Sequence, residues 1–331
     1  MCTKPRIIAP HVFYHVTSKG VSGEKILKER NMKEFFLKQL AVSLEKFSFQ
    51  CCAWSVMDDH YHLIVKSSDV SISKFMQRLN SVYAKKFNRE KSREGVVFFR
   101  RYASIISEET ELKKLIRYVH LNPVRCGSCT LKELDNYEWC GHENLINANK
   151  NKFLDKKTLL SQFSGSDPLS AYRKYVTTPD PDWQSDETIR RVRNANRGKL
   201  NFWKPELWVI GSDDFIRTVL EKDRCRKARI ARHITTGTSL DMLHELLQNS
   251  LHSEKDELFL QGRINQKSTA RELFAHTGAC CYDFRGTEIA EHLKITASAV
   301  SRMVSRYNRI SGREFLLNCV FGGLPREQPA F

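Results

Sequence analysis

The sequence lacks long apolar runs. No stretch approaches the ~18 consecutive apolar residues that a membrane-spanning helix requires, and residues 1–6 lead into no apolar segment of the kind found in secretory signals. We therefore expect a cytoplasmic protein that does not associate with a membrane. In that reducing compartment, the ten cysteines are expected to be core thiols or metal ligands rather than disulfides.

Acidic residues are also in short supply. The chain has 38 Asp and Glu against 54 Lys and Arg, which gives a formal net charge of +16. Such an excess indicates a polyanionic partner, with nucleic acid the first choice and an anionic membrane surface the second. The hydrophobic content of 41% excludes wholesale disorder. A length of 331 residues suggests two domains, with three as the alternative.

The first 150 residues alternate between strand and helix patterns. The expected strands are 11–17, 49–57, 61–66 and 102–106, and amphipathic helices follow the first, third and fourth of them. Asp58 and Asp59 mark a tight turn between the second and third strands. The order β-α-ββ-α-β-α predicts an α+β domain over 1–150, with one antiparallel sheet covered by helices.

The pattern changes after residue 150. A Pro- and Asp-rich stretch at 177–182 is typical of a linker or an exposed loop, so we expect 151–205 to be a connecting region. Beyond it, 206–331 reads as an all-α region, with helical periodicity at 213–221, 239–251 and 268–276.

Residues 286–307 have the pattern of a helix-turn-helix. An apolar seam would hold the two helices together, and polar side chains of the second helix would face outward: Ser298, Ser301, Arg302 and Arg306. These side chains suit base edges in the major groove and phosphates, so they are candidate contacts to duplex DNA. Lys294 occupies the turn, where glycine is frequent. An ordinary helical hairpin is the alternative.

His60 and His62 lie two residues apart in the third expected strand. Alternation along a strand places both imidazoles on one face, with Tyr61 on the other. Two imidazoles on one face form half of a divalent-metal site. The alternative is a pair of ordinary strand histidines, and periodicity alone favours it.

Several ordered motifs resemble the HUH endonucleases. Residues 57–63 resemble the histidine motif of single-tyrosine insertion-sequence transposases, and 117–125 closely resembles the catalytic helix of REP-associated tyrosine transposases. Residues 14–20 are similar to the first strand of that family, and 99–105 to the basic strand before the catalytic helix. The resemblance covers roughly residues 8–146.

This resemblance implies a ferredoxin-like HUH nuclease domain with Tyr118 as the nucleophile. It also implies that His60, His62 and a polar residue one helical turn after the nucleophile hold Mg²⁺ or Mn²⁺. That residue is Asn122, which lies four positions after Tyr118 and so on the same helix face. The implied reaction cleaves and rejoins single-stranded DNA, at hairpins or palindromic element ends, through a metal-assisted 5′-phosphotyrosine intermediate.

The implied partners are single-stranded DNA hairpins and the duplex DNA that flanks them, which would place the protein at a bacterial nucleoid. Family members act as monomers or as dimers, so a homodimer stays open. A domesticated, sequence-specific DNA-binding regulator without cleavage activity is the alternative function. Retention of His60, His62, Tyr118 and Asn122 favours the enzyme.

Basic residues crowd the segment around the fourth expected strand. Those that we expect to contact phosphate, rather than to form only a solvated charged loop, are Lys85, Lys86, Arg89, Arg100 and Arg101. Among the other tyrosines, Tyr83 falls on an apolar helix stripe and is expected in the core. Tyr102 adjoins two arginines and is a candidate for stacking on a base.

Two features stay open. The family commonly has Pro-Asn before the first histidine, whereas this chain has Asp58-Asp59. Asp59 could support a metal ligand through a hydrogen bond or serve only as a turn residue, and the turn interpretation is favoured. Four further residues have partial zinc-site spacing, although Cys-x-His is too tight for most structural zinc sites: Cys126, Cys129, Cys140 and His142.

Overall fold

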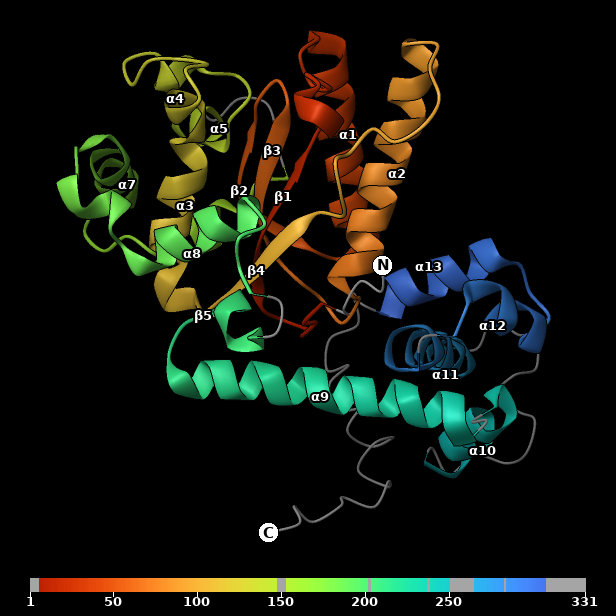
Figure 1. Ribbon diagram of the computed structural model, residues 1–331. Helices are drawn as coiled ribbons and strands as arrows, with labels where there is room; N and C mark the ends of the chain where they lie inside the picture. The colour runs from red at the N-terminus through yellow and green to blue at the C-terminus, as the bar shows by residue number, and fades with distance from the viewer. Residues whose placement is uncertain are drawn as a thin grey trace. The chain divides into compact units, whose positions relative to one another are not determined.

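The computed structural model describes residues 6–147, 153–201, 204–236, 239–250, 265–282 and 284–307. The chain forms two compact units, Met1–Lys222 and Asp223–Phe331, whose helices and strands are labelled in Figure 1. The expected connecting region 151–205 lies within the first unit. Residues 308–331 of the expected helical region lie outside the described residues. No described helix has the length and apolar content needed to cross a membrane.

The first unit is built on a five-stranded sheet of order β2-β3-β1-β4-β5. The strands are β1 (Phe13–Lys19), β2 (Gln50–Val56), β3 (His60–Lys66), β4 (Ala103–Ser107) and β5 (Val209–Ile210). The first four pair antiparallel in ferredoxin-like order, as the sequence predicts. The two-residue β5 pairs parallel to β4, and this addition was not predicted.

The outer strand β2 also has partners on its free side. Its Cys51 forms an isolated bridge with Leu154, and its Ser55 forms one with Cys140. The Val56 N–H donates to the carbonyl oxygen of Trp139 at 2.8 Å. The outer side of β2 is therefore hydrogen-bonded to other parts of the chain.

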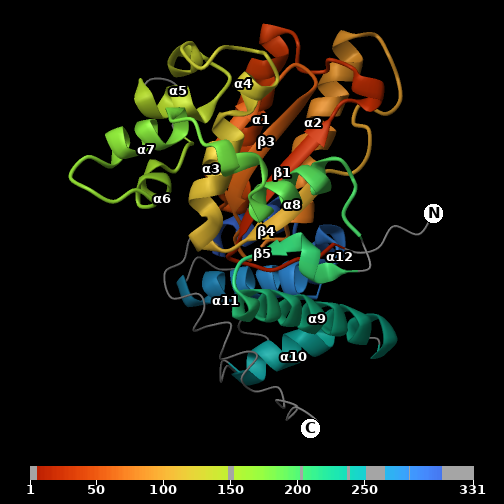
Figure 2. The ribbon, with the colours of Figure 1, turned by 60° about the vertical axis from the view of Figure 1, so that its left-hand side comes forward.

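Two long helices cover one face of the sheet. These are α1 (Arg30–Phe47) and α2 (Ile72–Glu90), which lie side by side in Figures 1 and 2. The Ser71 hydroxyl caps α2 by accepting from the Ser73 N–H at 3.1 Å. Tyr61 points to this face, with its ring centroid 4.5 Å from that of Phe36. The alternation of β3 thereby directs its two histidines to the opposite face.

The opposite face carries α3 (Leu112–His120), which follows a short 3-10 turn, η2 (Glu109–Glu111). The chain bends at Leu121 and continues as α4 (Asn122–Arg125). Pro123 lies in the first turn of α4, where its lack of an N–H removes no hydrogen bond within the helix. Tyr118 and Asn122 therefore belong to two consecutive short helices.

The first unit also contains shorter elements. They are η1 (Val21–Gly23), η3 (Leu134–Asn136), α5 (Gly141–Ile146), α6 (Lys156–Leu160), α7 (Pro168–Thr177), η4 (Pro181–Gln184), α8 (Glu187–Asn196) and η5 (Pro205–Trp208). The fully buried Tyr172 of α7 bonds through its hydroxyl to the Nδ1 atoms of His120 and His142, at 2.7 and 2.6 Å. Figure 2 shows α8 beside α3 and β4. These contacts make the region after residue 150 part of the framework around α3.

The second unit is helical, as predicted. Its helices are the end of α9 (Asp213–Thr236), α10 (Leu240–Ser250), α11 (Asn265–His276), α12 (Gly286–His292) and α13 (Ala297–Tyr307). A π turn (Thr277–Cys281) follows α11. The expected apolar seam is in the core, with Ile289 and Val300 buried among side chains of α10 and α11. Lys294, between α12 and α13, has a φ of 51°, a left-handed conformation that explains why glycine is frequent in this turn.

Candidate active site

Three histidines meet on the α3 side of the sheet. His60 and His62 project from β3 with ring centroids 5.1 Å apart. The neighbouring β1 adds His15, whose Nε2 lies 3.0 Å from the Nδ1 of His62. Burial lowers the pKa of His15 to about 3 and that of His62 well below its usual value. Both rings are therefore neutral at pH 7.

Tyr118 faces these histidines from α3. Its ring stands edge-on to His15 and to His62, with centroid distances of 5.7 Å to each. The side chain is only 7% exposed, and burial raises the pKa of its hydroxyl. Asn122 lies in the same cavity, where its Oδ1 accepts from the Cys126 thiol at 3.1 Å. The four residues that the family resemblance singled out therefore come together as expected from the spacing.

The cavity that holds them has a volume of about 820 Å³. Its lining is strongly basic, and none of the described residues that line it is acidic. The cations are Lys19, Arg100, Arg101, Arg125, Arg193 and Arg197. Arg125 contacts Tyr118 directly: its guanidinium carbon is 4.8 Å from the ring centroid of Tyr118, and its NH1 donates to the Tyr118 carbonyl oxygen at 3.1 Å. Such a lining suits a substrate with several negative charges.

Helix α8 completes the wall. Asn196, its last residue, donates through Nδ2 to the Tyr118 hydroxyl oxygen at 3.2 Å. Trp183, from the turn before α8, packs under the guanidinium groups of Arg117 and Arg125, at 4.7 and 5.2 Å from its ring. The sequence analysis did not identify these residues, because nothing local in 151–205 indicates contact with a tyrosine 78 positions away.

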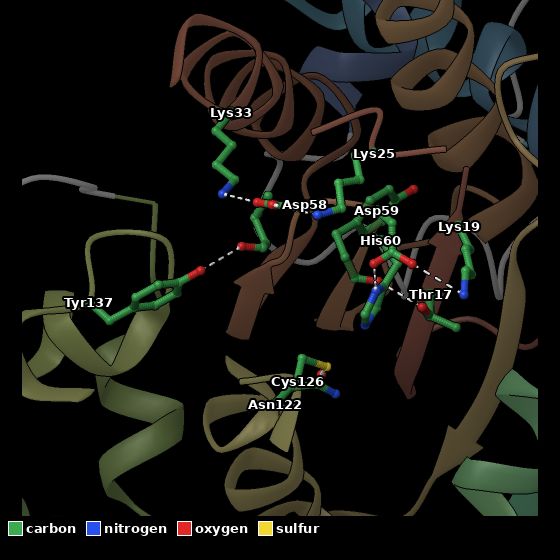
Figure 3. Close-up of polar contacts among 12 residues, drawn as sticks. Thr17, Lys19, Lys25, Lys33, Asp58, Asp59, His60, Asn122, Cys126 and Tyr137 are labelled. Carbon is green, nitrogen blue, oxygen red and sulfur yellow. Dashed lines mark hydrogen bonds and ion pairs between the residues drawn. The ribbon is translucent and has the colours of Figure 1, made fainter. Parts of the chain in front are cut away.

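The Asp59 carboxylate accepts a hydrogen bond from the His60 ring. Figure 3 shows this carboxylate between two cations, with Oδ1 2.5 Å from His60 Nδ1 and Oδ2 3.2 Å from Lys19 Nζ. Burial acts to lower the pKa of His60, but its hydrogen bonds with Asp59 and Cys126 and the charge of Asp59 together outweigh burial and raise that pKa to about 9. The hydrogen bond that Asp59 accepts from His60 also lowers the pKa of Asp59 to about 2. Its main-chain oxygen accepts from the Gly20 N–H at 2.8 Å, so Asp59 is both a turn residue and the partner of His60.

Asp58 has a separate role. Its carboxylate faces away from the histidines and pairs with Lys33 of α1 at 3.0 Å and with Lys25 at 4.0 Å (Figure 3). It therefore ties the β2–β3 turn to the first helix.

The donor set of the cavity fits a hard divalent cation. Within the described residues, no three His, Cys, Asp or Glu side chains form a metal-binding group. Asn122 adds an amide oxygen to the lining of the cavity that also holds His60 and His62, whose Nδ1 atoms are held by Asp59 and His15. Nitrogen and oxygen donors of this kind suit Mg²⁺ or Mn²⁺.

Comparison with known proteins identifies the domain that carries this site. Residues 10–122 match the family model described as an IS200-like transposase. This segment is similar to the IS200-like transposases. Among solved structures, a REP-associated tyrosine transposase bound to a REP hairpin is similar to this chain, with 15% identity and a TM-score of 0.37; the match covers 44% of this chain and 86% of that one. No curated protein matches the chain.

The IS200-like segment contains His15, His60, His62, Tyr118 and Asn122 and ends at the last of them. The other residues that surround Tyr118 come from beyond the matched segment: Arg125, Trp183, Arg193, Asn196 and Arg197. The wall formed by α8 is therefore an addition to the part of the transposase domain that the family model covers.

The basic residues singled out in the sequence fall into two groups. Arg100 and Arg101 line the cavity of the transposase domain. The other three, Lys85, Lys86 and Arg89, belong to α2 on the opposite face of the sheet. Tyr102, the candidate for base stacking, is 7% exposed, and its hydroxyl is 3.0 Å from that of Ser73.

The potential zinc ligands are engaged elsewhere. Cys140 is buried with its thiol 3.6 Å from the His120 carbonyl oxygen, and Cys126 faces Asn122. His142 bonds to Tyr172 and, through Nε2, to Asp135 at 2.8 Å. The structure thus places Cys126 in the cavity and Cys140 and His142 in the core, whereas Cys129 is half-buried outside both.

Proposed function

We propose that the protein is a metal-dependent DNA endonuclease and strand transferase that acts on single-stranded DNA. The IS200-like family match supports a DNA transposase of the HUH type. The observation that carries the finer proposal is the position of Tyr118, edge-on to His62 in a basic cavity that also holds His60 and Asn122. The substrates would be hairpins or palindromic element ends.

In the proposed reaction, the Tyr118 hydroxyl oxygen attacks the scissile phosphorus and loses its proton. The bond from phosphorus to the 3′ oxygen breaks, leaving a free 3′-OH and a 5′-phosphotyrosine. Attack by another 3′-OH reverses the step and rejoins the strand without an external energy source. Arg125 and Arg101 would neutralise the phosphate charge as it approaches the tyrosine.

His60, His62 and Asn122 would hold Mg²⁺ or Mn²⁺, which when bound polarises the scissile phosphate. The hydrogen bond that His60 donates to Asp59 fixes the orientation of the His60 ring, and the hydrogen bond between His15 and His62 does the same for His62.

The helices α12 and α13 are proposed to bind duplex DNA beside the cleaved hairpin. Ser298 and Arg302 are exposed on α13, as such a role requires, and Ser301 is half-buried. Arg306 has a partner within the unit, since its Nε donates to the Glu272 carboxylate at 2.7 Å. Arg302 is therefore the stronger candidate for a DNA contact.

A labelled-hairpin assay tests this function. Wild-type protein, Mn²⁺ and a single-stranded hairpin should give a covalent, protease-sensitive DNA adduct. Tyr118→Phe should abolish the adduct and keep DNA binding, because only the nucleophilic oxygen is lost while phosphate contacts remain. Tyr137→Phe is the matched control, since that hydroxyl lies outside the cavity at 3.5 Å from the Val56 carbonyl oxygen.

Two results would overturn parts of the proposal. An adduct that maps to another tyrosine would remove Tyr118 from the mechanism, and undiminished cleavage in EDTA would remove the metal. Duplex binding without any adduct would favour the alternative, a DNA-binding regulator.

A further inference from the structure

One large aromatic side chain stands exposed at the catalytic cavity. Phe99 is 53% exposed and lines the same cavity as Tyr118 and His62. Its neighbour Phe98 is 9% exposed and packs against the rings of Tyr61 and Tyr83, with centroid distances of 6.4 and 5.9 Å. The chain therefore buries one of two adjacent phenylalanines and presents the other to solvent.

The backbone at Phe99 is fixed. Its N–H donates to the Lys19 carbonyl oxygen at 2.9 Å, and the preceding Phe98 bridges to Gly20. One step further back, the Val21 N–H donates to the Val97 carbonyl oxygen at 3.0 Å. Phe99 thus projects from a segment that is bonded to the end of β1, rather than from a free loop.

Arg100 covers part of the Phe99 ring. Its guanidinium carbon lies 4.6 Å from the ring centroid, within the range of a cation–π contact. On its other side it lies against the backbone of Gly198, where an added Cβ would be 2.3 Å from Arg100 NH1. Glycine at 198, with a φ of 68°, leaves the space that the guanidinium fills. The pair therefore presents an aromatic surface next to a positioned cation.

The other aromatic residues nearby are less available. The ring of Tyr102 is covered by the Arg6 guanidinium, whose carbon lies 3.9 Å from the centroid, and the side chain is buried. Trp183 packs under the guanidinium groups of Arg117 and Arg125. Phe99 is the large apolar residue of the cavity lining that remains more than half exposed.

We propose that Phe99 is a stacking platform for an unpaired nucleobase next to the scissile phosphate, with Arg100 bound to the adjoining phosphate. This inference rests on the proposed single-stranded substrate, and it identifies the contact that would select unpaired over paired DNA. An aromatic residue within a positively charged lining is the combination with which proteins bind single strands. A base inside a duplex has both faces covered by its neighbours, so a fixed platform at the cleavage position favours unpaired DNA.

Equilibrium binding without metal provides the first test. We expect Phe99→Ala to weaken binding of a single-stranded oligonucleotide about tenfold, while Phe99→Tyr keeps wild-type affinity. The salt dependence should stay unchanged, because no charge is removed. Val96→Ala is the matched control: Val96 is 67% exposed near Phe99 but does not line the cavity. Equal affinities of Phe99→Ala and Val96→Ala would overturn the proposal.

A base analogue locates the contact. With 2-aminopurine placed in turn at each position around the cleavage site, one position should show quenched fluorescence in wild type and in Phe99→Tyr, and lose the quenching in Phe99→Ala. An abasic site there should weaken wild-type binding about tenfold and leave Phe99→Ala unaffected. Equal losses in both proteins would refute stacking on Phe99. Because these readouts need no cleavage, failure of adduct formation would refute the proposed nuclease while leaving this test intact.

Discussion

Replacing Tyr172 with phenylalanine should destabilise the first unit by about 2–4 kcal/mol. The Tyr172 hydroxyl is fully buried and forms hydrogen bonds with two imidazole nitrogens, the Nδ1 atoms of His120 and His142. Without it, two buried ring nitrogens lose their partner, and each such loss costs about 1–3 kcal/mol. Two such losses would sum to about 2–6 kcal/mol. A neutral imidazole can change tautomer and so recover part of this loss, and we therefore expect a value in the lower half of that range.

Tryptophan fluorescence during urea unfolding measures this effect in the intact chain. All five tryptophans lie in the first unit, at positions 54, 139, 183, 203 and 208, so the signal reports that unit alone. Tyr137→Phe is the control, because among the described residues its half-buried hydroxyl contacts no imidazole and bonds only to Ser128 and, at 3.5 Å, to the Val56 carbonyl oxygen; it should change the free energy of unfolding by no more than about 1 kcal/mol. Equal unfolding midpoints for the two variants would refute the reasoning.

Three further predictions concern pH, metal and DNA. Between pH 7 and pH 5 the free energy of unfolding of the first unit should fall. Burial holds the pKa of His120 well below 6.5, so the unfolded state binds a proton that the folded state does not, which lowers stability by about 2 kcal/mol at pH 5. His142 adds to this loss, because burial outweighs the effect of Asp135 and lowers the pKa of His142 as well. A stability that is flat over this range, followed by the same fluorescence, would contradict this. Asp59→Asn should weaken Mn²⁺ binding about tenfold in calorimetry, since His60 loses its charged partner, and an unchanged affinity would mean that Asp59 is a turn residue only. Arg302→Ala should reduce the slope of the logarithm of the duplex-binding constant against the logarithm of the salt concentration by about one. Lys222→Ala, which removes another exposed cation, is the control. An unchanged slope in Arg302→Ala would mean that α12 and α13 form only a structural hairpin.

Local periodicity was sufficient to predict much of the first unit. The alternation in β3 placed His60 and His62 on one face, and the four-residue spacing brought Tyr118 and Asn122 to the same cavity. These relations depend on the geometry of one strand or one helical segment, so the sequence contains them directly.

Contacts between distant segments could not be predicted in this way. The hydrogen bond from Asn196 to Tyr118 and the two-residue β5 depend on tertiary packing that has no repeating signal. Tyr102 and Phe99 show the same limit, because both adjoin arginines in sequence, yet tertiary packing buries the first and exposes the second.

The edges of the sheet restrict how two copies of this chain could associate. An open edge strand is a template on which a second molecule can extend the sheet. Here β5 occupies the outer side of β4, while Leu154, Cys140 and Trp139 occupy that of β2. A homodimer whose sheet continued across β2 would have to break the bonds on that side first. At the other edge the sheet ends in β5, a strand of two residues that offers little length for pairing with a second copy.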